Sequence, residues 1–333
     1  MKNIINSSRP WFERYEWEEP TVIDYLKAPL SRVVGGKVQG IEGVNHDEFI
    51  DLGDGVFSDF GGANNLGYMT PSKSLESKIK TRELWYRRSI GYTEAQKDYL
   101  SDLYEDSLVI MHEMHPCDEL IFNDLGIEYI NVFMSPIRFC KFGSLRSLYS
   151  NNTRIAEYFK LHEYSAKKYQ FWAVYLKMTS LLSAGKVSKR LPIDTCLIIG
   201  QCRFDYSKFD FSANRFVQLS DFESEVEAIC TSHNKVVYTK HPLSESNYDK
   251  EILSKYNIEI ISDISSYDLI CSSRIKTVAA LSSSVLKECE YLGKETHRFF
   301  TTFVDMDGKF TNVKRSKLKS ESFWNGLLKY ASN

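Results

Sequence analysis

The segment TCLIIG at residues 195–200 decides the fold, because it opens a regular alternation of apolar strands and amphipathic helices. The strand-like segments KVVYTK, IEIIS, KTVAAL and THRFFTT follow it, and each is preceded by a helix-like segment: ESEVEAICTS, NYDKEILSKY, SSYDLICS and SSVLKECEYLG. Strands that alternate with helices at this spacing predict a doubly wound α/β sheet. In such sheets ligands bind beyond the carboxyl ends of the strands, so polar residues at those ends are the first candidates for a site.

The half of the chain before this segment is less regular, with glycine-rich segments between short apolar ones. SLVIMHEMHP (107–116) predicts a buried strand from Leu108 to Met111, DELIFNDLG a helix closed by Gly126, and IEYINVFM the next strand. This β-α-β order predicts a second parallel sheet. The stretch from Asn152 to Leu182 predicts one long helix or a pair of helices.

The segment SAGKVSKRLP (183–192) has the composition of a linker, so we expect a domain boundary there. The predicted organisation is an N-terminal domain at 1–185 and a C-terminal, Rossmann-like domain at 190–312. Residues 313–333 carry a last helix, SESFWNGLLKYA, that is expected to pack back on the first domain. The expected fold class is therefore α/β, with two Rossmann-like domains facing across a cleft.

Composition narrows the function classes. The 333 residues carry a net charge of −2, which argues against a general nucleic-acid binder. Seven scattered cysteines without a CxxC pair predict buried thiols in a reducing compartment. The chain starts without an apolar signal segment and has no run long enough to span a bilayer, so a cytoplasmic protein is expected. The basic residues between Lys309 and Lys319 are a solvated linker or a patch for peripheral membrane association.

Polar residues follow two of the predicted strands in the second half. Gln201, Asp205 and Ser207 lie in the loop after TCLIIG, where a carboxylate and an amide would face the cleft or would only cap a helix. Lys240 and His241 end the next strand, and a cation and an imidazole beside a helix start suit a phosphate.

The segment SSSVLKE (282–288) lies where a strand turns into a helix. The hydroxyls of Ser282, Ser283 and Ser284, together with free backbone N–H groups, would make an anion cradle. Glu288, one turn further on, could accept hydrogen bonds from a ribose diol. The structural alternative is an N-cap serine with a capping-box acid.

GQCRFDYS, TKHP and SSSVLKE together resemble the motifs of the bacterial β-Kdo transferases of capsule and O-antigen synthesis, GT-B enzymes that use CMP-Kdo. The resemblance covers about residues 195–300. Here the lysine stands directly before His-Pro, which departs from the form that this motif has in the capsule enzymes. It implies that His241, Ser283 and Ser284 bind the CMP phosphate and that Glu288 binds the ribose. It also implies that Lys240 neutralises phosphate or sugar carboxylate and that Asp205 is the nucleophile of a retaining transfer.

The first domain is then expected to bind a glycan or lipid-linked glycan acceptor and to supply an acid/base. His112, Glu113 and His115 follow a predicted strand, and Glu113 or His112 could deprotonate the acceptor hydroxyl. A structural strand-end cluster is the alternative. HExHP on a strand end is not the helical zinc signature, so neither a metal nor a cofactor is predicted beyond the donor itself.

Two other reactions fit the same motifs. An inverting sialyl or other nonulosonate transferase would also use a CMP-sugar, but Asp205 would not attack. A teichoic-acid-type enzyme would transfer a polyol phosphate from a CDP-linked donor. A carbohydrate-binding protein without activity is the non-enzymatic alternative. Should the register differ, Asp210 would take the place of Asp205.

Overall fold

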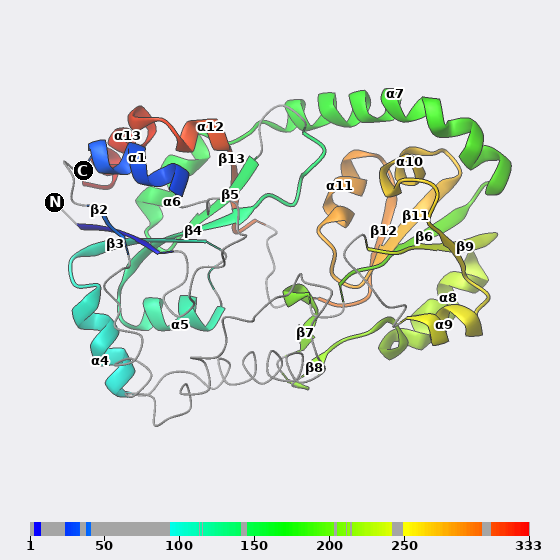
Figure 1. Cartoon of the computed structure of the whole chain (residues 1–333), viewed down its shortest axis with the longest axis horizontal. Helices are drawn as coiled ribbons and strands as arrows, with labels where there is room; N and C mark the ends of the chain where they lie inside the picture. Colours follow the sequence, from blue (N-terminus) through cyan, green and yellow to red (C-terminus); the bar gives the residue numbers. More distant parts are fainter. Residues whose placement is uncertain are drawn as a thin grey trace.

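The computed structural model describes residues 3–7, 24–33, 38–40, 94–112, 114, 116–140, 145–202, 205–210, 212–213, 215–241, 249–301 and 308–332. These residues form two α/β units, each built on its own sheet (Figure 1). The chain passes from the first unit to the second through one long helix and returns near its end.

The first unit contains a six-stranded sheet in the order β13-β5-β4-β3-β1-β2. Its neighbours from β2 to β4 are parallel, as the β-α-β pattern predicted, whereas β5 is antiparallel to both β4 and β13. Sequence reasoning did not identify β5 or β13. The strands are β1 (Asn3–Ser7), β2 (Val38–Gly40), β3 (Ser107–His112), β4 (Glu128–Met134), β5 (Leu145–Ser150) and β13 (Thr311–Lys314).

Helices cover both faces of this first sheet. Side chains alternate along β3, so that Leu108 and Ile110 join one apolar cluster while Val109 and Met111 join the other. The first cluster includes residues of α1 (Asp24–Val33), α6 (Thr153–Leu161), α12 (Arg315–Leu318) and α13 (Glu321–Ser332), and the second includes residues of α4 (Glu94–Leu103) and α5 (Pro116–Asp124). The last helix, α13, thus contacts α1 and α6 on the first unit.

The second unit contains a five-stranded sheet, all parallel, in the order β10-β9-β6-β11-β12. Counted along the chain, this is the order 3-2-1-4-5 of a doubly wound sheet. The strands are β6 (Thr195–Ile199), β9 (Lys235–Thr239), β10 (Glu259–Ile261), β11 (Ile275–Ala280) and β12 (Glu295–Arg298). The prediction of an α/β protein is confirmed; the second unit has an all-parallel sheet in the Rossmann order, whereas the sheet of the first unit is mixed.

Helices cover both faces of the second sheet, and alternate side chains along each strand pack against one set of helices or the other. Leu197 and Val237 pack with α7 (Ala166–Arg190), α10 (Ser266–Cys271) and α11 (Val285–Tyr291), which lie above the sheet in Figure 1. Cys196 and Val236 pack with α8 (Glu223–Ser232) and α9 (Lys250–Lys255) below it. A short hairpin, β7 (Phe209–Asp210) with β8 (Arg215–Phe216), and two 3₁₀ turns, Tyr206–Lys208 and Leu219–Phe222, complete the connection from β6 to α8.

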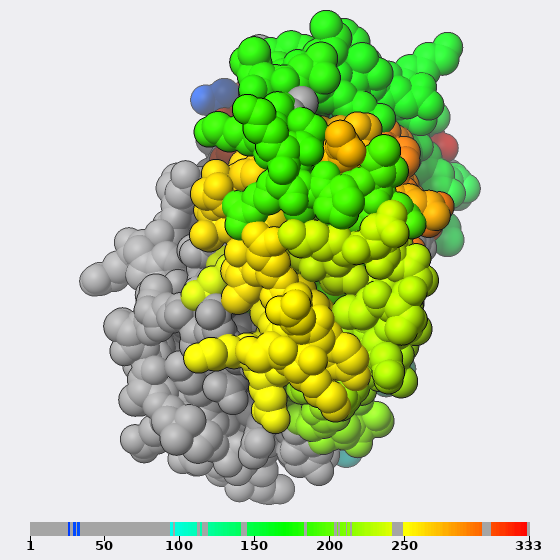
Figure 2. All heavy atoms as spheres, turned by 90° about the vertical axis from the view of Figure 1, so that its right-hand side faces the viewer, coloured from blue at the N-terminus to red at the C-terminus, as the bar shows by residue number. Residues whose placement is uncertain are grey.

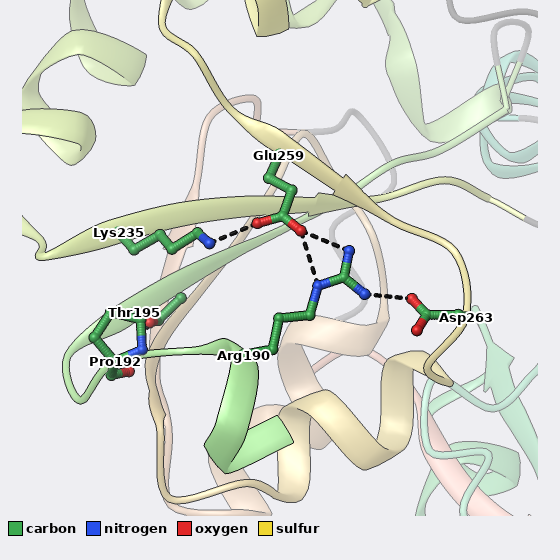
Figure 3. A network of polar contacts seen from close by, with 6 residues as sticks. All are labelled: Arg190, Pro192, Thr195, Lys235, Glu259 and Asp263. Atoms are coloured by element: carbon green, nitrogen blue, oxygen red, sulfur yellow. Dashed lines mark hydrogen bonds and ion pairs between the residues drawn. The ribbon is translucent and has the colours of Figure 1, made fainter. Parts of the chain in front are cut away.

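The helix α7 extends through the segment that composition predicted to be a linker. Val187 is fully buried, so tertiary packing holds the helix to Arg190 despite Gly185 and the serines around it. Arg190 then donates to Glu259, with Nε and Nη2 at 2.8 and 2.5 Å from Oε1, and to Asp263 at 2.5 Å (Figure 3). Lys235 binds the other oxygen of Glu259. The end of α7 is therefore tied to the starts of β9 and β10.

None of the helices that the structure describes is both long enough and apolar enough to cross a bilayer.

Candidate functional site

The order of the second sheet creates one place where neighbouring strands send their connections to opposite faces. β6 and β11 are adjacent and parallel, but β6 leads toward α8 on one face and β11 leads to α11 on the other. The crevice beyond such a pair is where doubly wound proteins bind ligands. Gly200 and Gln201 follow β6, and Leu281 and Ser282 follow β11, so both loops start at this crevice.

A chain of four polar side chains joins the two loops, and we call Gln201, Ser282, Ser207 and Asp205 the switch-point network. Gln201 accepts a 2.7 Å bond from the Ser282 backbone N–H and donates to Ser282 Oγ at 3.3 Å. The hydroxyls of Ser282 and Ser207 lie 2.8 Å apart. Ser207 donates to Asp205 Oδ1 at 2.8 Å. Each donor thus finds an acceptor, and the chain ends on the carboxylate.

Asp205 is held by only one of its two oxygens. Its Oδ1 accepts from both the N–H and the hydroxyl of Ser207, at 3.0 and 2.8 Å. Within the described part of the chain, Oδ2 accepts no hydrogen bond. The carboxylate is half-buried and therefore oriented, with one oxygen available to a ligand.

His241 follows β9 and lies near enough to Asp205 for the charge of that carboxylate to act on its pKa. Burial lowers the pKa of His241 below its usual value, the Arg138 guanidinium adds to the lowering, and Asp205 opposes both. Its Nδ1 is 3.1 Å from Cys202 Sγ. Burial raises the pKa of the Cys202 thiol to about 11, and Asp205 contributes to the shift. A neutral imidazole and a protonated thiol are therefore expected at neutral pH.

A layer of buried groups behind the loop was not identified from the sequence. Gly200 packs against the Tyr238 ring so closely that a Cβ would lie 2.2 Å from Oη. Tyr238 donates to Asp249 at 2.8 Å, and burial raises the pKa of that carboxyl, opposed by this bond and by the charge of Lys208. Lys208 is fully buried and donates to the Cys202 carbonyl at 3.2 Å. The presence of a lysine, Lys208, in the predicted site loop was the one sequence feature that could have indicated this layer.

Glu288 is used differently from the expected ribose contact. It is 2% exposed, and its Oε1 accepts from the backbone N–H groups of Arg138 and Phe139 at 2.5 and 2.9 Å. Its other oxygen accepts from the Tyr267 hydroxyl at 2.8 Å. Burial raises the pKa of Glu288, and these hydrogen bonds together with the Arg138 charge oppose the shift. Glu288 thus ties a segment that follows β4 of the first sheet to α11 of the second unit.

The other predicted donor-site residues lie outside the switch-point network. Ser284 precedes α11 without a side-chain capping bond, so the capping-box alternative does not hold there. Ser283 Oγ accepts from Val285 N–H at 3.4 Å. Lys240 follows β9 and is half-buried.

His112 ends β3, far along the chain from the switch-point network. Glu113 and His115 lie outside the described residues, and the acid/base assignment stays a prediction. Across the described ranges, no three His, Cys, Asp or Glu side chains gather as a metal site.

Known proteins resemble this chain only distantly. No family model matches the chain, and no curated protein matches it. Among solved structures, KpsC from Thermosulfurimonas dismutans, a beta Kdo 2,7 transferase, aligns with 14% identity and a TM-score of 0.37, over 78% of this chain and 97% of KpsC. The UDP-GlcNAc 2-epimerase from Neisseria meningitidis aligns with 12% identity and a TM-score of 0.33, over 98% and 92%.

The contact between Gly200 and Tyr238 yields a stability prediction. Gly200→Ala must displace the Tyr238 ring and break its bond to the buried Asp249, which should lower the free energy of unfolding by about 1–3 kcal/mol. Gly185→Ala in α7 is the matched control, because its Cβ meets no atom within 4 Å. It should raise stability by about 0.5–1 kcal/mol. Urea titration measures both, and a Gly200→Ala protein as stable as wild type would contradict the packing.

The buried carboxyl of Glu288 predicts a pH dependence. Because its pKa is raised in the folded state above the ordinary 4.5, the stability tied to its protonation is full below pH 4.5. That stability is lost as pH rises through the folded pKa. Glu288→Gln keeps an acceptor for Arg138 and Phe139 but does not titrate. The free energy of unfolding of wild type, minus that of Glu288→Gln, should therefore fall as pH rises above 4.5.

Denaturant titrations of both proteins across this pH range supply the measurement, since all other groups cancel in the difference. Glu288→Ala serves as the comparison, because it leaves two buried N–H donors without an acceptor and should destabilise at every pH. Parallel curves for wild type and Glu288→Gln would show that the carboxyl does not titrate abnormally.

Proposed function

We propose that this chain is a glycosyltransferase that binds a CMP-activated acidic sugar in the crevice beyond β6 and β11. The first candidate for this sugar is Kdo. The observation that carries the proposal is the switch-point network, which ends on the half-buried Asp205, a carboxylate whose charge acts on His241. A carboxylate, an imidazole and serine hydroxyls meet where the sheet topology places ligands. This combination suits a donor that carries one phosphate and an electrophilic carbon.

The proposed role of His241 follows from its contact with Cys202. A protonated thiol donates to Nδ1, so the neutral ring carries its proton on Nε2. That N–H can donate to an anionic phosphate oxygen of CMP without requiring a charged imidazole. Arg138, whose charge acts on His241, would supply the positive charge that the phosphate needs as CMP leaves.

The proposed reaction is a double displacement. Asp205 Oδ2 attacks the anomeric carbon, the bond from that carbon to the phosphate oxygen breaks, and CMP leaves with the electron pair. An acceptor hydroxyl then attacks the same carbon and displaces Asp205. The acceptor proton goes to a base, for which Glu113 or His112 of the first unit is proposed.

The other predicted contacts are assigned around this centre. We propose that Ser283, Ser284 and Lys240 bind phosphate or sugar carboxylate. A carboxylate accepts about four hydrogen bonds, and Glu288 already accepts three from its own chain. We therefore revise its proposed role from ribose binding to holding the segment that carries Arg138. The proposed acceptor is a glycan or lipid-linked glycan of a bacterial surface polysaccharide.

The donor site predicts a specific loss of CMP affinity. His241→Ala removes a hydrogen bond to a charged phosphate and should weaken CMP binding by about 1.5–3 kcal/mol, measured by calorimetry. His233→Ala is the control, because His233 precedes β9 at the opposite edge of the sheet and contacts Thr277. Unchanged CMP affinity in a folded His241→Ala protein would remove His241 from the site.

The nucleophile predicts a covalent intermediate. Wild type incubated with CMP-Kdo should gain the mass of one Kdo residue, and Asp205→Asn should lose this adduct while it keeps CMP binding. Asp210→Asn is the matched control, because Asp210 belongs to a second Asp-x-Ser turn, where Ser212 and Ala213 bond its Oδ1 in the β7–β8 hairpin. It should form the adduct as wild type does.

Other outcomes distinguish the alternatives. Transfer of sugar by Asp205→Asn at the wild-type rate would exclude it as the nucleophile and favour an inverting nonulosonate transferase. Binding of CDP-glycerol in preference to CMP-Kdo would favour polyol-phosphate transfer. Absence of any nucleotide binding would reject the transferase proposal as a whole.

A further inference from the structure

The long helix α7 exposes an apolar face to solvent. Six large apolar side chains line it at successive turns of one side, and Leu182 is 94% exposed. The opposite side of α7 packs on α10 and α11 of the second unit. Contiguous exposed apolar surface of this kind marks an interaction site. We call the set the α7 face: Phe171, Val174, Tyr175, Met178, Leu181 and Leu182.

The charges of α7 are of one sign. Its 25 residues include six basic ones and no Asp or Glu. Lys167 and Lys168 lie four and three residues before Phe171, and Lys186 and Lys189 lie four and seven residues after Leu182, so both pairs fall on the side of the α7 face. All four lysines are exposed, and none forms an ion pair with another described residue.

A second basic element adjoins the start of this helix. Lys168 and Lys314 both lie over the Tyr164 ring, with Nζ at 5.5 and 5.8 Å from its centroid. Lys317 of α12 lies 2.9 Å from His162, which ends α6. Figures 1 and 2 both place α7 along the upper edge of the molecule, and Figure 1 shows α12 at the same edge.

An apolar band about 17 Å long, bounded at both ends by lysines, suits a flat anionic surface. Apolar side chains of such a helix insert at the boundary of head groups and acyl chains, and the lysines extend to the lipid phosphates. A second copy of this chain suits it less. Two α7 faces packed about a two-fold axis would bring Lys167 and Lys168 of one copy toward Lys186 and Lys189 of the other, without an acidic residue of α7 to pair them.

We infer that α7 is a membrane-docking helix that lies in the surface of an anionic phospholipid bilayer through the α7 face and its flanking lysines. The part of α7 from Lys167 to Lys189 is about 33 Å long and would lie along the bilayer plane. This docking does not require the proposed transferase reaction, since none of its residues belongs to the switch-point network.

The test is co-sedimentation of the full chain with two kinds of vesicle, one of phosphatidylcholine alone and one that also contains phosphatidylglycerol. The protein should bind only the phosphatidylglycerol vesicles, and added salt should weaken binding. Removing each lysine, in Lys186→Gln and Lys189→Gln, should weaken it roughly fivefold. Leu182→Ser should weaken vesicle binding roughly tenfold, because the variant loses the free energy gained when the leucine side chain passes from water into the bilayer.

Two controls match these variants elsewhere on the surface. Leu120→Ser changes a leucine of α5 that is 57% exposed, and Lys250→Gln changes an exposed lysine of α9; both should bind as wild type. All variants should keep the wild-type melting temperature. Failure of wild type to bind phosphatidylglycerol vesicles overturns the inference. So does a solution dimer that Leu182→Ser dissociates, because a second copy would then cover the α7 face.

Discussion

The bond between the Ser282 backbone N–H and the Gln201 side chain is the contact on which the candidate site depends. A doubly wound sheet must separate its loops at the strand pair where the winding reverses, and here that pair is β6 and β11. Without a bond between them, the loops after β6 and β11 would run apart toward opposite faces of the sheet. Gln201 is 4% exposed, so its amide must be fully paired, and Ser282 provides both a donor and an acceptor. The position of Asp205 follows from this link through Ser207.

A second buried group couples this site to the other unit. Glu288 bonds the backbone of the segment after β4, and that segment also buries Ile137, Phe139 and Cys140 among the apolar residues of the second unit. The carboxyl is costly to bury, and three hydrogen bonds to its two oxygens offset that cost. The side chain of Arg138 is thereby brought close enough to influence His241. A first-unit residue thus contributes positive charge to a site built on the second sheet.

The sequence predicted the second unit closely because its local signals agree. The strands β6, β9, β10 and β11 are short and largely apolar and alternate with helices, and polar residues lie in the loops after β6 and β11. The partners Arg138 and Asp249 could not be predicted, because they reach the site only through tertiary packing, whereas Lys208 lies within the site loop itself and was overlooked. In the first unit, β5 and β13 were missed because they pair antiparallel across a sequence separation that no local pattern records. The linker was misjudged because buried Val187 outweighs the composition of its neighbours.

The apolar residues of α7 show where sequence reasoning reaches a physical limit. Phe171, Trp172, Val174 and Tyr175 occur nearly in succession, so hydrophobic residues surround the middle of the helix and periodicity does not say which side is buried. The helices α10 and α11 of the second unit cover only the side of α7 that carries Tyr169 and Ala173. The other side remains in water, where each large apolar side chain forgoes roughly 1.5–3 kcal/mol of burial energy. A helix that exposes six such residues and carries basic but no acidic residues of its own has a surface suited to an apolar and anionic partner such as a bilayer.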